Sequence, residues 1–319
     1  MRDRVLWVTL AVVAAVAILP IVTVSDTMRE EIFLILLYVV LASSVNIMMG
    51  YTGYVTFGHI VFFGLGGYTG FYLVQNHGAN FVLAALAGGI VSGAVAFGLG
   101  IPVLRLRGAY FALATIGVNE VARAAIGNID QLGGSVGMFF NVNVYQAYGG
   151  ARGALWLAYE AMVVVALANI ATSYIIKKSK FGLGLMAIRE DQDAAQVLGI
   201  DPARAKVITF TISAFFPGLA GALFFFKNGI IEPSPAFEFT RSLEALVIVM
   251  LGGWGTVTGP IVGSVVYEQL RGYLLTSPTF SSFHLFLAGL MLLLIVLFVT
   301  AGVVGWLRQK SARLRRYLA

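Results

Sequence analysis

Ten stretches of this 319-residue chain are apolar, and most of them are long enough to cross the hydrocarbon core of a membrane. A spanning helix needs about 20 apolar residues. Hydrophobic residues make up 59% of the chain and charged residues 11%, whereas soluble domains are about 25% charged. A soluble fold of this length would leave much of that apolar surface in water, so lipid is the expected solvent. The sequence therefore predicts an all-α polytopic membrane protein with about eight to ten transmembrane helices.

The predicted spans lie at roughly residues 5–24, 31–49, 54–75, 81–101, 109–126, 154–176, 207–226, 241–254, 259–275 and 284–305. The eighth and ninth are short. They form either two thin spans or one re-entrant pair around Gly252-Gly253-Trp254-Gly255. Arg2 and Arg4 precede the first span, as they would in a signal peptide. Its apolar run exceeds the 7–15 residues of a signal h-region, which favours an uncleaved anchor.

Lysine and arginine gather between and beyond these spans, which predicts the orientation of the chain. The clusters lie at residues 2–4, 105–107, 177–206 and 306–319. A cytoplasmic N-terminus places every cluster on the cytoplasmic side, as the positive-inside rule requires, and puts both termini there. We read the net charge of +6 as this orientation signal, so no nucleic-acid partner is expected. The basic tail 306–319 is expected to meet anionic lipid of the bilayer.

Glycines, hydroxyl groups and a histidine interrupt the apolar region between Gly50 and Gly70. A weakened helix at membrane depth is tolerated only where protein or a water-filled cavity covers it. Such segments hold the binding path in many transporters, which favours membrane transport. A second glycine-rich break lies at residues 252–263. The candidate residues of a translocation pathway at the two breaks are Thr52, Tyr54, Thr56, His59, Trp254 and Thr256.

These six residues also have simpler interpretations. Hydroxyl groups and His59 can form hydrogen bonds between helices. Trp254 can instead be an anchor at the membrane interface. The breaks occupy matching positions in two groups of four spans, residues 31–126 and 207–305, which predicts an inverted repeat. We expect one transmembrane domain over residues 1–319, with a cytoplasmic loop at 177–206.

Part of this loop has the pattern of a short amphipathic helix from Leu185 onward. Gly199 and the following Asp201-Pro202 would end it, because glycine suits a helix C-terminus and proline cannot continue one. An ordinary solvated connection is the alternative. The mixture of apolar and charged positions favours docking on another protein.

Asp193-Ala194-Ala195, followed after three residues by Gly199, resembles the Glu-Ala-Ala-x-x-x-Gly coupling motif of ABC importer permeases. Residues 50–70, 105–115, 182–199 and 251–260 further resemble the LivM-type permease of branched-chain amino acid importers. This resemblance runs from about residue 30 to residue 305. Two departures are Asp193 in place of the usual glutamate and the position of the motif's later proline, which is found only at Pro217, inside an apolar run.

The resemblance implies the ABC importer permease fold and a subunit that imports branched-chain amino acids through the prokaryotic cytoplasmic (inner) membrane. It implies a homologous second permease, two ABC ATPase subunits and an extracytoplasmic amino-acid-binding protein as partners. The partner subunits would hydrolyse ATP, and this chain would bind no cofactor. The residues that it implies for coupling to the ATPase are Arg189, Glu190, Asp191, Asp193, Ala194, Ala195 and Gly199.

Several classes of chemistry lack their motifs in this sequence. No Gly-x-x-x-x-Gly-Lys-Ser/Thr occurs, and neither does His-Glu-x-x-His. Cysteine is absent and the three histidines are dispersed, so we expect neither an enzyme nor a metal site.

Other transport functions stay open. Related permeases handle urea, short amides, sugars or nucleosides. An ion-coupled secondary transporter would need a buried carboxylate, for which Glu120, Glu244 and Glu268 are candidates. Glu120 and Arg123 stand three residues apart and are expected to pair.

Overall fold

Nine of the ten predicted spans coincide with helices in the computed structural model, which describes residues 4–23, 25–276 and 302. The tenth span, 284–305, and the basic tail lie outside the described residues. The all-α polytopic fold is confirmed. The helices are α1 (Arg4–Thr23), α2 (Asp26–Thr52), α3 (His59–His77), α4 (Phe81–Val103), α5 (Ala109–Gly127), α6 (Val142–Gln146), α7 (Gly150–Lys178), α8 (Lys180–Glu190), α9 (Gln192–Val197), α10 (Pro202–Asn228), α11 (Pro233–Ala236), α12 (Phe239–Gly252) and α13 (Gly259–Thr276). Strands β1 (Met138–Phe139) and β2 (Ile230–Ile231) pair antiparallel.

The ends of the long helices follow from local sequence. The side chain of Ser25 accepts a hydrogen bond from the backbone N–H of Met28 and caps α2. Asp201 caps α10, whose first residue is Pro202. A capping oxygen satisfies an orphan N–H, and proline at the first position lacks that N–H altogether. Gly53 and Gly229 end the same two helices with left-handed backbone, which glycine adopts without strain.

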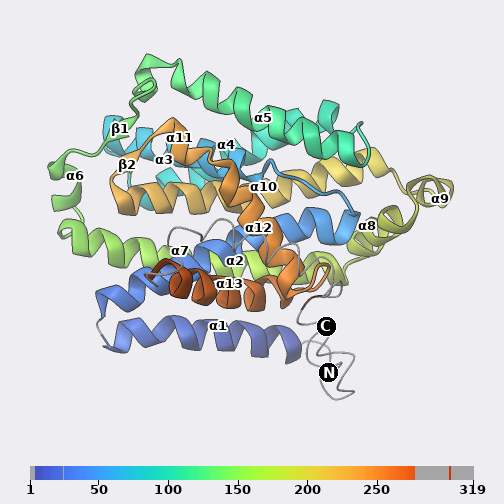
Figure 1. The fold of residues 1–319 in the computed structure, drawn as a ribbon, viewed down its shortest axis with the longest axis horizontal. Coiled ribbons are helices and arrows are strands. Elements are labelled where there is room, and N and C mark those ends of the chain that lie inside the picture. Colours follow the sequence, from blue (N-terminus) through green and yellow to red (C-terminus); the bar gives the residue numbers. More distant parts are fainter. Residues whose placement is uncertain (1–3, 24, 277–301, 303–319) are drawn as a thin grey trace.

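The long helices run side by side, and α2 lies in the interior (Figure 1). By length and composition alone, α2, α4, α7 and α10 qualify as membrane spans among the described helices. The most apolar window of α2 is 83% buried inside the protein, whereas that of α4 is 39% buried. The apolar face of α4 is therefore left for lipid. One end of the bundle carries β1, β2 and α6, and the other carries α8 and α9 (Figure 1).

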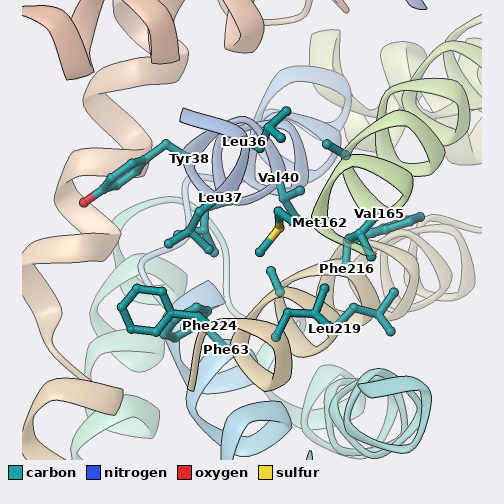
Figure 2. Packing of buried hydrophobic residues seen from close by; sticks show 14 of the residues in the cluster. Leu36, Leu37, Tyr38, Val40, Phe63, Met162, Val165, Phe216, Leu219 and Phe224 are labelled. Atoms are coloured by element: carbon teal, nitrogen blue, oxygen red, sulfur yellow. The ribbon is translucent and has the colours of Figure 1, made fainter. Parts of the chain in front are cut away.

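The core lies where α2, α3, α7 and α10 meet. Leu37 of α2, Phe63 of α3, Met162 of α7 and Leu219 of α10 belong to one cluster of buried residues, shown in Figure 2. Lipid is as apolar as these side chains, so the hydrophobic effect holds the helices together only weakly. Close packing and hydrogen bonds between helices carry the stability instead.

Glycines let α3, α4 and α10 approach one another closely. A Cβ atom at Gly66 of α3 would overlap the backbone of Gly218 in α10. A Cβ at Gly88 of α4 would lie 2.6 Å from the Gly66 carbonyl oxygen. Small residues at such crossings are the usual way that membrane helices pack. The prediction of a weakened helix is therefore wrong for residues 59–70, because α3 is continuous there and its glycines serve packing.

The predicted breaks are confirmed over shorter segments, residues 53–58 between α2 and α3 and residues 253–258 between α12 and α13. Helix α12 has 14 residues, a length of about 21 Å, which is less than the roughly 30 Å of a hydrocarbon core. It runs obliquely from the level of α11 to the end of α13 (Figure 1). The choice between two short spans and a re-entrant pair stays a prediction, as do the inverted repeat and the single-domain assignment.

Candidate functional site

The second break, residues 253–258, lies against the last turns of α2, which lead directly into the first break at residues 53–58. We call the end of α2 together with these two segments the break junction. The side chain of Asn46 holds the second break against α2 through two hydrogen bonds. Its side-chain oxygen accepts a hydrogen bond from the Gly255 N–H at 2.8 Å, and its amide nitrogen donates to the Thr256 carbonyl at 2.9 Å. Gly50 permits the close approach, because a Cβ there would lie 2.7 Å from the Gly255 nitrogen.

Arg189 connects α8 to the break junction. Its Nη1 donates to the Gly50 carbonyl at 3.0 Å, and its guanidinium lies 5.4 Å from the centre of the Trp254 ring. The carbonyl groups in the last turn of α2 have no partner within the helix, so a cation is favoured at this end. Nε and Nη2 donate to the exposed Glu190 carboxylate.

Tyr54 lies in the first break and connects it to α9 and α10. Its hydroxyl donates to Gln192 Oε1 at 2.9 Å and accepts from Lys206 Nζ at 2.9 Å. Lys206, which is 3% exposed, also donates to the Leu104 carbonyl and to Gln192. These three oxygens use all the donors of the ammonium group. The buried charge is thus satisfied within the chain and ties the ends of α4, α9 and α10 to the first break.

The other predicted pathway residues at the first break are buried among helices. Thr52 donates to the Met48 carbonyl, and Thr56 accepts from the Gly58 N–H. His59 Nε2 shares a hydrogen bond of 3.1 Å with the Ser213 hydroxyl of α10. Rings of Phe62 and Phe210 meet the imidazole edge-on.

At the second break, Thr256 accepts from the Gly259 N–H and donates to the Gly253 carbonyl, which fixes the turn before α13. Trp254 is 42% exposed. The hydrogen bond of His59 joins two helices, as the simpler interpretation expects, whereas those of Thr52, Thr56 and Thr256 are local to their own segments. Their role in a pathway stays a prediction.

The predicted cytoplasmic helix is formed by two shorter helices, α8 and α9. The Asp191 carboxylate accepts hydrogen bonds from the N–H groups of Asp193 and Ala194 at 2.9 and 3.0 Å. Asp191 is thus the N-cap of a new helix, and its own backbone is extended. Gly199, with a φ of 85°, follows α9 as expected. The Asp191 cap therefore starts a second helix within the segment for which the amphipathic pattern predicted one helix.

The inner face of α8 and α9 packs on the bundle. Leu185, Ile188 and Ala195 form one buried cluster with Ile47 and Tyr51 of α2. The outer face exposes two large apolar side chains beyond Ala195, Val197 at 88% and Leu198 at 79%. Large apolar side chains exposed side by side are typical of an interaction surface.

An ion pair also links α9 to the loop between α4 and α5. Arg107 Nη2 lies 3.0 Å from Asp193 Oδ1, and both side chains are largely exposed. The hydrogen bond from Arg107 to Asp193, and then the charge of that carboxylate, raise the pKa of the Arg107 guanidinium. The motif residue Asp193 therefore has a partner in the chain, while Glu190, Asp191 and Ala194 face solvent.

The three candidate carboxylates each have a partner. Glu120 and Arg123 pair as predicted, with Nη2 and Oε2 2.6 Å apart. Glu244 accepts a hydrogen bond from Tyr38 and lies 3.8 Å from Arg271 Nε. Arg271 also pairs with Glu268 at 3.3 Å. The sequence indicated no partner for Glu244, because Tyr38 lies 206 residues away. The Glu268 pair was missed although Arg271 stands three residues after it, a spacing that indicates a pair on a helix.

The sequence of this chain matches one family model and several named permeases. The family model described as the permease component of a branched-chain amino acid transport system matches residues 28–296. The high-affinity branched-chain amino acid transport system permease protein LivM of Salmonella typhimurium is 31% identical over 82% of this chain and 66% of its own length. LivM of Escherichia coli is 29% identical over 82% of this chain and 67% of its own.

A differently named permease of the same system also matches. LivH of Salmonella typhimurium is 30% identical over 45% of this chain and 46% of its own length. The chain spans about two thirds of the length of the LivM relatives. No solved structure matches.

Proposed function

Because this chain belongs to the family of branched-chain amino acid transport permease components, we propose that it forms half of the translocation path of an ATP-driven importer. Its cargo would be branched-chain amino acids, which the LivM relatives are named for. The chain is a multi-pass membrane protein, and we place it in a prokaryotic cytoplasmic membrane with both termini in the cytoplasm. Urea, short amides and sugars are the alternative cargoes, which uptake of labelled leucine in competition with each would test.

The proposed partners are a homologous second permease, two ABC ATPase subunits and an extracytoplasmic amino-acid-binding protein. Two differently named permeases of one system, LivM and LivH, both resemble this chain, which supports a pair of permeases. The sequence has no phosphate-binding Gly-x-x-x-x-Gly-Lys-Ser/Thr motif. The ATPase subunits would therefore hydrolyse the ATP, and this chain would bind no cofactor of its own.

The outer face of α8 and α9 carries this proposal. Val197 and Leu198 stand exposed beside Asp193 and Ala194, while the inner face is fixed to α2. A short helix pair with one buried and one exposed apolar face suits docking into a groove of another protein. We propose that the ATPase docks on this outer face. Movements of the docked helices would then shift the six pathway candidates through the break junction.

Replacing Val197 and Leu198 together by glutamate tests the docking proposal. Both side chains are exposed, so the chain should fold normally, but two charges would be buried in the docked complex. We expect co-purification of the ATPase subunits to fall at least about tenfold, since burying unpaired charge costs more than 1.4 kcal/mol. ATP-driven uptake should be lost with it.

Val136→Glu is the matched control, since Val136 is 68% exposed in the loop before β1, at the other end of the bundle. This variant should keep the ATPase subunits. Normal ATPase recovery with the Val197→Glu, Leu198→Glu variant would show that α8 and α9 are not the docking site.

Glu244→Gln separates this function from an ion-coupled transporter. Glutamine still accepts the hydrogen bond of Tyr38, and Arg271 keeps Glu268 as its partner. We expect ATP-driven uptake into proteoliposomes to persist in this variant and to be independent of an imposed pH gradient. Glu120→Gln serves as the control at an exposed pair. Uptake without ATP that follows the pH gradient and disappears in Glu244→Gln would favour the ion-coupled alternative.

A further inference from the structure

We propose that Arg189 is the positioning residue that ties the ATPase-docking helices to both breaks, so that a displacement of α8 moves the end of α2 and residues 253–258 together. This inference rests on the proposed function. It differs from the family-based expectation, in which Arg189 belongs to the docking surface. The side chain is 28% exposed and points from α8 to the break junction.

The contacts of Arg189 reach both breaks at once. Nη1 donates to Gly50 in the last turns of α2, and the guanidinium lies over the Trp254 ring in the second break, 5.4 Å from its centre. The other polar links of these helices do not reach the second break. Gln192 bonds Tyr54 and Lys206, and Asp193 pairs with Arg107. Among these links, that of Arg189 therefore joins α8 directly to the second break.

The backbone of both breaks leaves space for the arginine. A Cβ at Gly53 would lie 3.0 Å from Arg189 Cγ, and a Cβ at Gly255 would lie 3.3 Å from Nη1. Both glycines have positive φ angles, 77° and 71°, which side chains rarely adopt. Glycines in both breaks thus leave room for the Arg189 side chain.

The chemistry of the guanidinium explains why arginine suits this position. A planar fork donates in several directions within one plane and stacks on an aromatic ring with its face. Arg189 uses Nη1 for Gly50 and Nε and Nη2 for Glu190, while the positive charge of its guanidinium lies over the Trp254 ring. Lysine keeps the charge at the end of α2 but offers a point donor without a planar face.

Asn46 links the second break to α2, independently of Arg189. It holds Gly255 and Thr256 to α2 through two hydrogen bonds, so the second break and the end of α2 form one unit. Arg189 attaches α8 to this unit on its other side. A shift of α8 on docking or ATP binding would therefore reach the helices on both sides of the breaks. Without the arginine, α8 would still dock an ATPase and keep its apolar contacts with Ile47 and Tyr51, but it would lose its direct contact with the second break.

The test uses the full transporter reconstituted in liposomes, with chain, partners and binding protein. In Arg189→Met we expect normal recovery of the ATPase subunits and sustained ATP hydrolysis. The amount of substrate imported per ATP should fall about tenfold, the size typical of residues that carry coupling between sites. Arg189→Lys should restore uptake per ATP partly, because it returns the charge at Gly50. Arg107→Met breaks the exposed pair with Asp193 on the same helices and should leave uptake per ATP unchanged.

A distance measurement gives a second readout that does not depend on turnover. The chain has no cysteine, so spin labels at Leu183→Cys on α8 and Val265→Cys on α13 would be unique; both positions are exposed. We expect one narrow distance distribution with native Arg189 and a broadened one with Arg189→Met. If Arg189→Met does not fold, Trp254→Leu removes the other side of the contact and should also lower uptake per ATP.

Two results would overturn the proposal. Unchanged uptake per ATP in Arg189→Met, with an unchanged distance distribution, would make the arginine a helix cap without a role in transmission. Loss of the ATPase subunits in Arg189→Met would make it a docking residue. Failure of the proposed function itself is recognised separately, because the native chain would then recover no ATPase subunits.

Discussion

Gly66→Ala is expected to lower the stability of the protein sharply, although it adds a single methyl group. The new Cβ would overlap the backbone of Gly218, and backbone cannot relieve a clash by changing rotamer. Helices α3 and α10 would have to separate, which costs about 3 kcal/mol or more, at or above the usual upper range for overpacking. Thermal unfolding in detergent, followed by size-exclusion chromatography, would show an earlier transition and a smaller folded fraction.

Gly98→Ala provides the matched control. Gly98 lies within α4, more than one turn before its end, and a Cβ there would meet nothing within 4 Å. Alanine favours a helix by up to about 1 kcal/mol relative to glycine, so this variant should be as stable as the native chain or more stable. If both variants unfolded at the native temperature, the close crossing of α3 and α10 would be incorrect.

Asn46→Leu is expected to reduce transport far more than its effect on stability explains. Leucine has a similar size but leaves the Gly255 N–H and the Thr256 carbonyl without their partner. We expect a loss of about 1–3 kcal/mol in unfolding free energy, the cost of buried groups left unsatisfied. The second break would also detach from α2, so uptake per folded transporter should fall about tenfold. Uptake in proteoliposomes, normalised to folded protein, measures this.

Asn169→Leu separates the two effects. Asn169 is as buried as Asn46 and donates to the Val40 carbonyl and the Ser44 hydroxyl, away from the break junction. Its replacement should cost similar stability while uptake per folded transporter stays near the native level. Equal losses of uptake in both variants would mean that Asn46 only stabilises the bundle.

The helical fold was predictable because each span carries its own signal. Apolar length, and caps such as Ser25 and Gly53, are local properties of the chain. The interpretation of the glycines was only partly right, because local sequence does not distinguish a glycine that ends a helix from one that packs inside it. Gly53 ends a helix and Gly66 packs inside one, yet both are glycines in an apolar segment. What distinguishes them is the helix that lies opposite, and only Gly66 faces Gly218.

The partners of the polar residues at the break junction could not be predicted from local sequence either. Lys206 counts in the sequence as a charge that orients the chain, but the fold buries it against Tyr54 and Leu104. Asn46 lies within a long apolar run and has no motif around it. Its partners are 209 and 210 residues away, at Gly255 and Thr256. A single sequence contains no signal that links such distant positions.

The sequence by itself therefore determined the class of the protein, the place of nine described helices and the family resemblance, since apolar length and motif order are read along the chain. Tertiary structure alone decided that the second break packs against the end of α2 and that Arg189 points to this junction instead of to solvent. The physical reason is that a buried hydrogen bond depends on which atoms the packed helices bring within about 3 Å. That distance is set by the packing of α2, α8 and the segment before α13 together.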